Sequence, residues 1–569
     1  MKISKIEIQN FRGFKKEIIE LDDITVFVGE NNTGKSTILD AIKLIIGAQD
    51  WNDRLSKYDY HLNSSTSRAG DEGEILLRVE VSEKREDEWP DEIQQTLPDS
   101  IDIEENGLRH FYLAMKGKYN HTDEKSTDNK EFQSKTYSAK GAKANTGKCF
   151  SDFRKLLPVF YITSLRDSSK EFQQKRGLFK KFLDSEIIPS DKRNQLETKL
   201  ATLNSEIIEV LDNIKLLKGH LKKSMTVLSG TDEAIVDIEP LPSDLNDLVG
   251  KAGIILENII GIRLPLERHG SGAQSLSVLF LYESFLTVLL ATEYDKFSEP
   301  VLLIEEPEAH LHPSAVRLFW KFLEKMPGQK IVTTHSGDII SSVPFSRIRR
   351  IVGVSGENRV RAMSDLSFDP KEKRFLRNYI TYSRGELFFA KCWLIVEGET
   401  EQAFFENLLN KDGFLDQKGI RIIQFTQISL DVLFKLSSQL CMRWFLITDG
   451  DQAGQGYKQT AINALPSGVN SDDCVYTILE KTIEVYLMTN GFSGIYENYL
   501  SPSNKASLSA LNLNGVQYYE KLYKLLTKQK RAYKVSKPQV VLEIVEAINN
   551  GTSYPQLLNE VRVKLEATK

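Results

Sequence analysis

Short apolar runs, separated by glycine-rich and acidic turns, divide the chain into two successive series of predicted buried strands. The first series lies at residues 24–28, 159–162, 301–304 and 331–334. The second lies at residues 393–396, 421–423 and 444–448, with helical stretches between the strands. Each run has the length of a strand rather than a helix, and strands that alternate with helices favour parallel sheets. The sequence therefore predicts two consecutive α/β domains.

The stretches between these runs carry three further patterns. Residues 74–81 read as another strand, whereas residues 115–148 are so rich in polar side chains and glycine that we predict a mobile surface loop. In residues 190–223, leucine, isoleucine and valine recur at helical spacing, which predicts a long helix or a helical hairpin. Because this segment splits the first series of strands, we favour a dimerisation arm, and an ordinary amphipathic core helix is the alternative.

These patterns give four predicted segments. They are the N-terminal part of a first α/β domain at 1–170, a helical insert at 171–245, the C-terminal part of that domain at 246–382 and a second α/β domain at 383–569.

Composition narrows the class of protein. The 569 residues are 41% hydrophobic and 27% charged, as in a globular protein with several domains, and the formal net charge of −5 means that any nucleic-acid site must be a local patch. Four widely spaced cysteines, none in a C-x-x-C pair, argue against a disulfide scaffold or a structural zinc site. These cysteines suggest a reduced, cytoplasmic compartment. The most apolar stretch, residues 276–291, is too short and polar to span a bilayer, so we expect a core helix and no membrane contact.

The first strand leads into a phosphate-binding motif. Residues 29–36 match G-x-x-x-x-G-K-[ST], after a predicted strand and before a predicted helix at about 36–46. Backbone N–H groups of such a loop surround phosphate oxygens, the lysine reaches the β- and γ-phosphates, and the hydroxyl binds Mg²⁺. The predicted ATP-binding residues here are Gly29, Asn32, Gly34, Lys35, Ser36 and Thr37.

The strand at 301–304 delivers two carboxylates at its C-terminal end, where ligands bind in α/β sheets. We assign Glu305 to Mg²⁺ and Glu306 to the general base that activates the attacking water. His335 follows the next strand and is placed to sense the γ-phosphate, although a structural histidine is the alternative.

A Gly-Ser-Gly turn at residues 270–272 opens an apolar helix and resembles the signature loop of ABC-type ATPases, in which Ser271, Gly272 and Gln274 would contact nucleotide. A plain helix cap would explain the turn equally well. Together with Asn10-Phe11-Arg12-Gly13-Phe14 and the motifs above, residues 1–365 resemble the RecF/SMC-like ABC ATPases. In that class the signature loop completes the site of a partner subunit, which implies a homodimer or larger homo-oligomer.

A second acidic cluster follows the second series of strands. Glu397 and Glu401 come directly after the strand at 393–396, and Asp449 and Asp451 come after the strand at 444–448, with Gly398 and Gly450 expected to allow tight turns. Carboxylates packed this closely repel unless a cation bridges them, and oxygen-only clusters suit Mg²⁺ or Mn²⁺. Such ions can support phosphodiester cleavage. The arrangement resembles the Toprim domain of topoisomerases, primases and some nucleases.

Two later features add candidates. Glu480 and Glu484 are four residues apart and are predicted on one helix face, with Glu484 the preferred extra metal ligand. Residues 518–537 carry seven basic side chains with four tyrosines interleaved. Such a tract can contact phosphates and stack on exposed bases, while a solvated amphipathic helix is the competing interpretation.

An ABC ATPase followed by Toprim resembles the overcoming-lysogenization-defect (OLD) family nucleases over nearly the whole chain. The resemblance implies an ATPase-regulated DNA endonuclease, commonly in defence against bacteriophage, and the family includes the Gabija nuclease and retron-associated effectors. It also implies a catalytic lysine near the C-terminus, for which Lys537 is the nearest match. A companion helicase or a retron reverse transcriptase with its DNA is a possible partner. The rivals are a repair-type DNA-binding ATPase whose Toprim domain only binds, and a strand-passing or priming enzyme.

Overall fold

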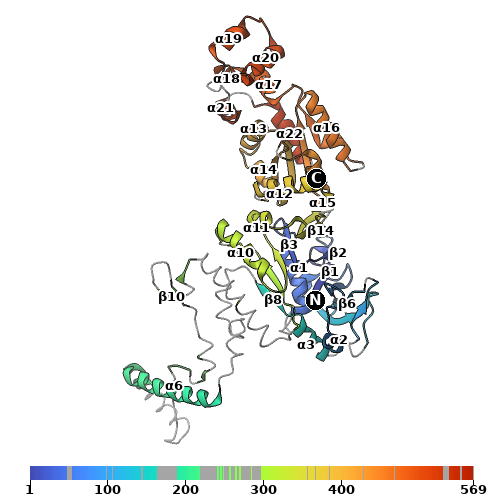
Figure 1. Cartoon of the computed structure of the whole chain (residues 1–569), viewed down its shortest axis with the longest axis vertical. Coiled ribbons are helices and arrows are strands. Elements are labelled where there is room, and N and C mark those ends of the chain that lie inside the picture. The colour runs from blue at the N-terminus through green and yellow to red at the C-terminus, as the bar shows by residue number, and fades with distance from the viewer. Residues whose placement is uncertain are drawn as a thin grey trace. The chain divides into compact units, whose positions relative to one another are not determined.

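The structure is a computed structural model in which contacts divide the chain into two compact units. The first comprises Met1–Lys2, Glu83–Ile101 and Lys140–Lys330, and the second Ile3–Ser82, Asp102–Ala139 and Ile331–Lys569. The structure describes residues 1–47, 54–97, 99–105, 107–141, 145, 147–162, 189–217, 240–242, 244–245, 248, 255–257, 263–265, 268–270, 284, 297–309, 311–354, 356–364, 367–382, 385–426, 428–466, 468–529, 537–551 and 554–567. Figure 1 labels the elements.

The first unit contains two predicted strands and the predicted long helix. Strand β8 (Val159–Ile162) runs parallel to β11 (Val301–Glu305), with Leu303 opposite Tyr161. Helix α6 (Ser190–Val210) confirms the helical periodicity, and Leu211 is its C-cap residue. The other elements are α2 (Asp91–Thr96), α3 (Gly147–Leu156), α10 (Pro313–Lys325) and the antiparallel pair β9 (Ile255–Glu257) and β10 (Arg263–Pro265). The predicted core helix at 276–291 lies almost entirely outside the described residues.

The second unit begins with a sheet in the order β2-β1-β4-β6-β5, and β7 pairs with β6. The strands are β1 (Lys2–Phe11), β2 (Phe14–Glu20), β4 (Ile75–Ser82), β5 (Asp102–Ile103), β6 (Arg109–Asn120) and β7 (Lys125–Gln133). The predicted loop at 115–148 is therefore wrong, because β6 and β7 form a hairpin that extends from Tyr112–Gln133 to Asn120–Lys125. The outer strand carries polar side chains on an exposed edge, so it lacks the apolar alternation that identifies most strands.

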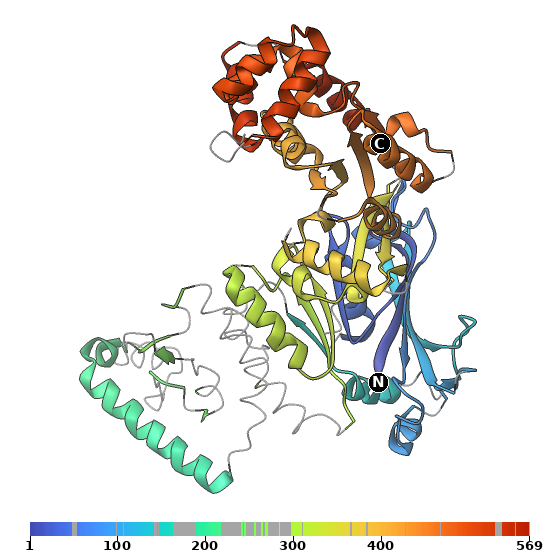
Figure 2. The same ribbon diagram turned by 45° about the horizontal axis from the view of Figure 1, so that its top comes forward.

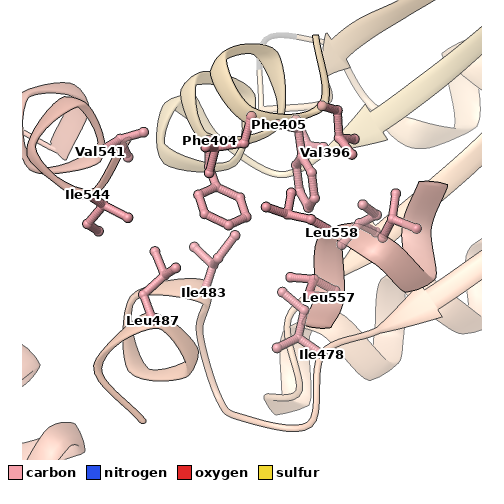
Figure 3. Close-up of a cluster of buried hydrophobic side chains, with 14 of the residues drawn as sticks. Val396, Phe404, Phe405, Ile478, Ile483, Leu487, Val541, Ile544, Leu557 and Leu558 are labelled. Carbon is pink, nitrogen blue, oxygen red and sulfur yellow. The ribbon is translucent and has the colours of Figure 1, made fainter. Parts of the chain in front are cut away.

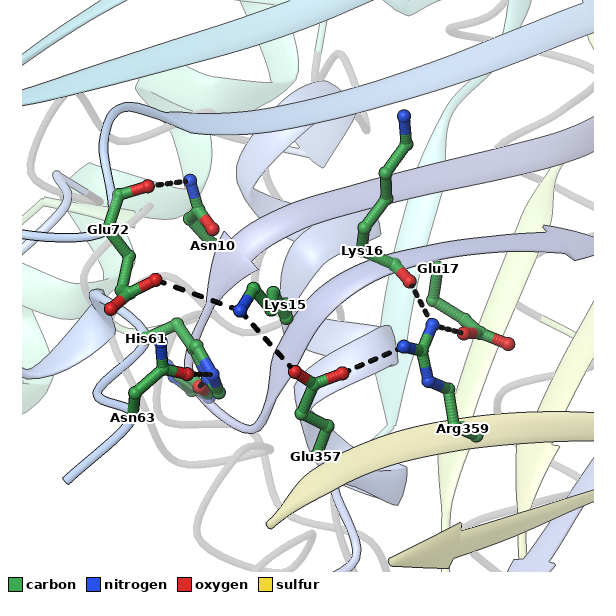
Figure 4. Close-up of polar contacts among 10 residues, drawn as sticks. Asn10, Lys15, Lys16, Glu17, His61, Asn63, Glu72, Glu357 and Arg359 are labelled. Carbon is green, nitrogen blue, oxygen red and sulfur yellow. Dashed lines mark hydrogen bonds and ion pairs between the residues drawn. The ribbon is translucent and has the colours of Figure 1, made fainter. Parts of the chain in front are cut away.

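Ion pairs join the first hairpin to β14 (Glu357–Ala362). Arg359 donates to the Lys16 carbonyl and pairs with Glu17 at 3.3 Å and with Glu357 at 2.8 Å, while Lys15 lies 3.7 Å from Glu357 (Figure 4). These contacts fix β14 against β2.

The phosphate-binding loop leaves β3 (Ile24–Gly29), which runs parallel to β13 (Ile348–Val354). Strand β14 pairs antiparallel with β13, and the Thr334 N–H beyond β12 (Gln329–Thr333) donates to the Phe27 carbonyl. The helices around this sheet are α1 (Lys35–Ile42) with a following π turn (Lys43–Gly47), α11 (Gly337–Ser342) and α12 (Pro370–Tyr382), and short 3₁₀ turns lie at Lys57–Asp59, Phe345–Arg347 and Glu386–Phe388.

The second series of strands forms the predicted parallel sheet, in the order β16-β15-β17-β18. Its strands are β15 (Cys392–Val396), β16 (Ile420–Gln424), β17 (Arg443–Thr448) and β18 (Val475–Thr477). The helices that alternate with them are α13 (Glu399–Leu409), α14 (Phe414–Lys418), α15 (Leu430–Leu440) and α16 (Gln452–Ala464), with a 3₁₀ turn at Ser471–Asp473. Strands β15 and β17 are buried along nearly their whole length, as their continuous apolar sequences predict.

Helices after the sheet share one core with it. They are α17 (Ile483–Leu487) with a π turn (Met488–Phe492), α18 (Ser493–Asn498), α19 (Pro502–Ser509), α20 (Gly515–Thr527), α21 (Lys537–Asn549) and α22 (Gln556–Ala567), drawn in orange and red in Figure 2. Phe404 and Phe405 of α13 pack among Ile483, Ile544 and Leu557 in this core (Figure 3). The C-terminal helices are therefore fixed relative to α13, the helix that starts at the acidic cluster.

Buried Arg350 links β13 to the start of the second sheet. Its guanidinium donates to the carbonyl oxygens of Phe388 (3.1 Å), Leu440 (2.8 Å) and Ala390 (2.7 Å). Burial lowers the pKa of Arg350 to about 10, and three carbonyl acceptors compensate the buried charge. No helix in the described part of the chain is both long and apolar enough to cross a membrane.

Candidate functional site

The phosphate-binding loop has the backbone that its glycines predict. Gly34 caps α1 with φ 90°, and a Cβ atom there would lie 2.8 Å from the Phe14 ring and 2.9 Å from the Asn358 amide. Lys35 is buried, and its Nζ donates to the carbonyl oxygens of Gly29 (3.0 Å) and Glu30 (2.7 Å). Ser36 and Thr37 follow in the first turn of α1. The lysine is thus held over the loop in which phosphate oxygens would sit.

Arg12 in the turn at residues 10–14 links this turn to α1, the helix that follows the loop. Arg12 Nη1 donates to Asp40 on α1 at 2.5 Å, and its Nε donates to Asp59 at 2.9 Å. Although burial alone would lower the pKa of Arg12, the two carboxylates raise it above its ordinary value. Sequence inspection identified the turn as part of a family motif but did not assign this role to Arg12.

Two further groups lie near the loop within the second unit. His335 follows the backbone bond from Thr334 to Phe27, and its ring stacks on Phe389 with centroids 6.1 Å apart. Lys391, directly before β15, forms an ion pair with Glu30 of the phosphate-binding loop at 3.0 Å. No sequence signal pointed to the Glu30–Lys391 pair, because the two residues are far apart along the chain.

The acidic pair after β11 belongs to the first unit. Tyr161 of β8 donates its hydroxyl hydrogen to Glu305 at 2.9 Å, and Glu306 has a left-handed backbone with φ 45°. Their predicted roles toward Mg²⁺ and water remain predictions. The predicted signature-loop residues Ser271, Gly272 and Gln274 lie outside the described residues.

The structure brings the four predicted carboxylates of the second sheet to one edge. Glu397 follows β15 and Asp449 follows β17, and these strands are parallel neighbours with Ile395 opposite Leu446. Glu401 lies in the first turn of α13, and Asp451 caps α16 by accepting from the Gly454 N–H at 2.8 Å. The parallel register therefore explains why two short motifs fifty residues apart form one cluster.

Close backbone packing fixes the loop after β17. A Cβ atom on Gly450 would lie 2.5 Å from the carbonyl oxygens of Ile478 and Glu480, and one on Gly454 would lie 1.9 Å from the Asp449 carbonyl. The expected need for glycine at 450 is confirmed on grounds of space. The chain also bends at Gly398, between β15 and α13, but φ there is −142°, so this bend does not depend on a left-handed backbone.

A fifth carboxylate and the predicted lysine complete the cluster. Glu484 is buried on α17, where it accepts from the Thr400 hydroxyl at 3.2 Å and pairs with Lys537 of α21 at 3.0 Å. The predicted shared helix face of Glu480 and Glu484 is wrong: Thr482 caps α17 by accepting from the Val485 N–H, so Glu480 precedes the helix. Thr400 was missed, because a buried threonine in a first helical turn carries no local signal of function.

Burial and mutual repulsion shift the pKa values of these acids upward. The pKa of Asp449 rises to about 8 and that of Glu401 to about 7, in both cases first through burial and then through neighbouring carboxylates. The pKa of Glu397 is also raised by burial and by Asp451. Burial alone would lower the pKa of Lys537, but Glu484 and Tyr523 raise it well above its ordinary value. A positive charge placed among the acids would relieve the repulsion.

The donor set fits a hard divalent cation, because every candidate ligand at the edge is a carboxylate oxygen. Within the described ranges, however, no three acidic, histidine or cysteine side chains already stand in ligand geometry. Two acids have local partners instead: Glu401 accepts from the Gly398 N–H at 3.1 Å, and Asp451 caps α16. Side-chain rotations would therefore be needed to gather the carboxylates around an ion.

The basic tract at 518–537 is described only in part. On α20, Tyr518 donates to Glu497 at 3.0 Å, and Tyr519 and Tyr523 pack against the core. These tyrosines face inward, as in the amphipathic-helix alternative, whereas the tract between 530 and 536 lies outside the described residues.

Two family profiles match successive parts of the chain. The profile of the family described as "Protein of unknown function (DUF2813)" matches residues 1–386, and the one described as "Overcoming lysogenization defect protein-like, TOPRIM domain" matches residues 388–451. The uncharacterized protein YbjD of Escherichia coli is 23% identical over 99% of this chain and 98% of its own length. The SMC head domain from Thermotoga maritima superposes with a TM-score of 0.33 at 13% identity, covering 64% of this chain and 100% of that domain.

Two relatives are named as nucleases. Endonuclease GajA of Bacillus cereus is 22% identical over 72% of this chain and 68% of its own length, and the OLD nuclease of Thermus scotoductus is 24% identical over 72% and 74%. The chain thus belongs to the family described as "Protein of unknown function (DUF2813)", and its residues 388–451 match the Toprim domain of overcoming-lysogenization-defect-like proteins.

Proposed function

We infer that the protein is an ATPase-linked, divalent-metal-dependent DNA endonuclease. The observation that carries this inference is the edge of the parallel sheet where Glu397, Glu401 and Asp449 cluster, with carboxyl pKa values raised by burial and by one another. An acidic cluster of this kind is costly unless it binds a cation. The named nuclease relatives with an OLD-like Toprim domain support DNA as the substrate.

The chain's own residues divide the work at this edge. Glu397, Glu401, Asp449 and Asp451 would hold Mg²⁺ or Mn²⁺, with Glu484 as a further ligand. Bound there, the ion supplies positive charge that favours deprotonation of water and stabilises a leaving oxygen. Lys537, held at 3.0 Å by Glu484, is placed to neutralise negative charge that develops on the phosphate.

ATP is the proposed ligand of the phosphate-binding loop, where Lys35 would contact phosphates and Ser36 a Mg²⁺ ion. Glu305 and Glu306 are the proposed metal-side acid and general base of ATP hydrolysis. The proposed biological role is defence against bacteriophage. It rests on the likeness to the OLD-family nucleases and not on either site.

Assembly through α6 is part of the proposal. Leu196, Leu203 and Val210 recur every seven residues and are 41%, 43% and 80% exposed, whereas Leu200 and Asn204 between them are buried. An exposed apolar stripe at this spacing suits a helix–helix contact between two copies of the chain.

Plasmid cleavage tests the function. Wild type should cut DNA in Mg²⁺ or Mn²⁺ and stop in a chelator, and Asp449→Ala should lower the rate by at least about 10²-fold because a ligand to the ion is lost. Glu406→Gln on α13 is the matched control, because Glu406 is exposed and lies outside the cluster. Undiminished cutting by folded Asp449→Ala would place the nuclease elsewhere, and a wild type that binds DNA but never cuts it would favour a binding-only ATPase.

A further inference from the structure

A cavity of about 360 Å³ opens beside the acidic cluster, between α13, α17, α18, α20 and α21. It shares Thr400, Glu484 and Lys537 with the cluster and extends past them to Leu526 and Val540. Its volume lies in the range of small-ligand sites, roughly 300–1,000 Å³. The space is therefore continuous with the proposed cleavage site but larger than an ion and its water require.

One residue that lines the cavity has a buried polar atom that calls for a ligand. Tyr496 of α18 is 2% exposed, and within the described part of the chain its hydroxyl has no hydrogen-bond partner. A buried hydroxyl without a partner is unfavourable to the fold, and in native proteins such groups usually serve a bound molecule or water.

The cavity walls suit a flat, mostly apolar body. Leu526 and Val540 are buried aliphatic side chains, and Tyr523 presents a half-buried ring beside Lys537. Aromatic rings and aliphatic walls bind the faces of nucleobases, whereas the Tyr496 hydroxyl can bond to a base edge. At the shared end, Lys537 provides the positive charge that a phosphate needs.

We propose that this cavity is a subsite for one nucleotide of the DNA strand, taking an unstacked base against Tyr523 and Tyr496 while its phosphate faces the acidic cluster. The proposal rests on the proposed nuclease function for the identity of the substrate. A base can enter such a cavity only after it leaves the stack, so the enzyme should favour unpaired or distorted DNA over a continuous duplex.

A direct test blocks the cavity from its exposed rim. Thr527 is an exposed lining residue at the end of α20, and Thr527→Trp should fill the cavity without changing the core. Ala506→Trp on α19 is the control, because Ala506 is exposed and uncharged and does not line the cavity. Binding is measured by fluorescence anisotropy with single-stranded oligonucleotides in Ca²⁺, a readout that requires no cleavage. We expect Thr527→Trp to weaken binding about tenfold and the control to leave it unchanged.

Oligonucleotides with abasic residues identify the bound group. Without bases, wild type and Thr527→Trp should bind equally, because the lost contact is with the base itself. Tyr496→Phe should weaken binding of normal DNA about threefold and leave abasic DNA unaffected. It should leave thermal stability unchanged or higher, since it removes an unsatisfied hydroxyl. A destabilised Tyr496→Phe with unchanged DNA affinity would show a purely structural role and overturn the proposal.

These experiments also distinguish a DNA strand from a free nucleotide as the ligand, and the subsite proposal from the proposed nuclease function. Equal DNA affinity of wild type and Thr527→Trp refutes the subsite, whatever the cleavage assay shows. Binding of a free deoxynucleoside monophosphate is measured in a Lys35→Ala background, which weakens binding at the proposed ATP site. If Thr527→Trp loses only this binding and keeps its affinity for DNA, the cavity binds a small molecule and the DNA subsite is refuted. If the wild type never cuts DNA but Thr527→Trp weakens base-dependent binding, the nuclease function fails and the subsite stands.

Discussion

The raised pKa of Asp449 predicts that this side chain destabilises the metal-free protein at alkaline pH. A carboxyl whose pKa is about 8 in the fold and near 3.8 in the unfolded chain binds its proton more tightly when folded. Its contribution is therefore favourable below pH 4 and is lost progressively as the pH rises from 4 to 8. Asp449→Asn keeps the size of the side chain and removes the ionisation, so it should stabilise the metal-free Toprim sheet.

The magnitude follows from the shift. At about 1.36 kcal/mol per pKa unit, a rise to about 8 sets an upper limit of roughly 6 kcal/mol. Glu401 and Glu397 share the repulsion and Asp449 is partly exposed, so solvent and coupling reduce the effect. We expect a gain of about 1–3 kcal/mol for Asp449→Asn at pH 8 and roughly half of that at pH 6.

Hydrogen exchange measures this gain locally. The amides of β15 and β17 report opening of the Toprim sheet itself, which matters because a chain with several domains has no single unfolding free energy. In EDTA, wild type and Asp449→Asn are compared at each pH, with Glu406→Gln as the control, so that intrinsic exchange rates cancel. Adding Mg²⁺ should protect the wild type and have little effect on Asp449→Asn. If Asp449→Asn exchanges faster than wild type at pH 8 in EDTA, the carboxylate stabilises the fold and the reasoning is wrong.

Three other predictions concern the ATPase and assembly. Glu306→Gln should bind ATP and hydrolyse it about 10²-fold or more slowly in a single turnover, and equal rates would remove Glu306 from the base role. Leu203→Glu should lower the mass measured by light scattering relative to both wild type and Thr202→Glu, whereas an unchanged mass would exclude α6 from the interface. Lys391→Met removes the exposed ion pair with Glu30, so it should change the free energy of unfolding by under about 1 kcal/mol. It should nevertheless alter the effect of ATP on DNA cleavage. An unaltered ATP effect would argue against coupling of the two sites through this pair.

The parts of the fold that were predictable have strong local signals. Buried strands in parallel sheets read as continuous apolar runs, so β15 and β17 were evident from their sequences. Because parallel strands end at the same edge, the positions of Glu397 and Asp449 followed from strand order alone. The phosphate-binding loop was equally clear, since its glycines precede a helix directly after β3.

The errors arose where the signal depends on contacts rather than on local pattern. Strand β7 is polar because it lies at an edge and its partner, β6, supplies the apolar positions. Glu480 was assigned to a helix because it lies four residues before Glu484. Thr482 caps α17 between them, so the helix begins after Glu480. Tyr496 and Tyr523 occupy ordinary helical core positions, so only the packed helices reveal the cavity between them.

Long-range pairs explain why the candidate site extends beyond its motifs. Lys537 reaches Glu484 only because α21 packs on α13, and Thr400 of α13 bonds the same carboxylate. One lysine cannot balance five clustered acids, so in the absence of a cation this edge repels a DNA phosphate as well as itself. Binding of the metal ion should therefore strengthen binding of DNA. The positive charge that reduces repulsion among the carboxylates also reduces their repulsion of the phosphate. Glu484 holds Lys537 at this edge, and its bond to Thr400 joins the ion pair of the C-terminal helices to α13.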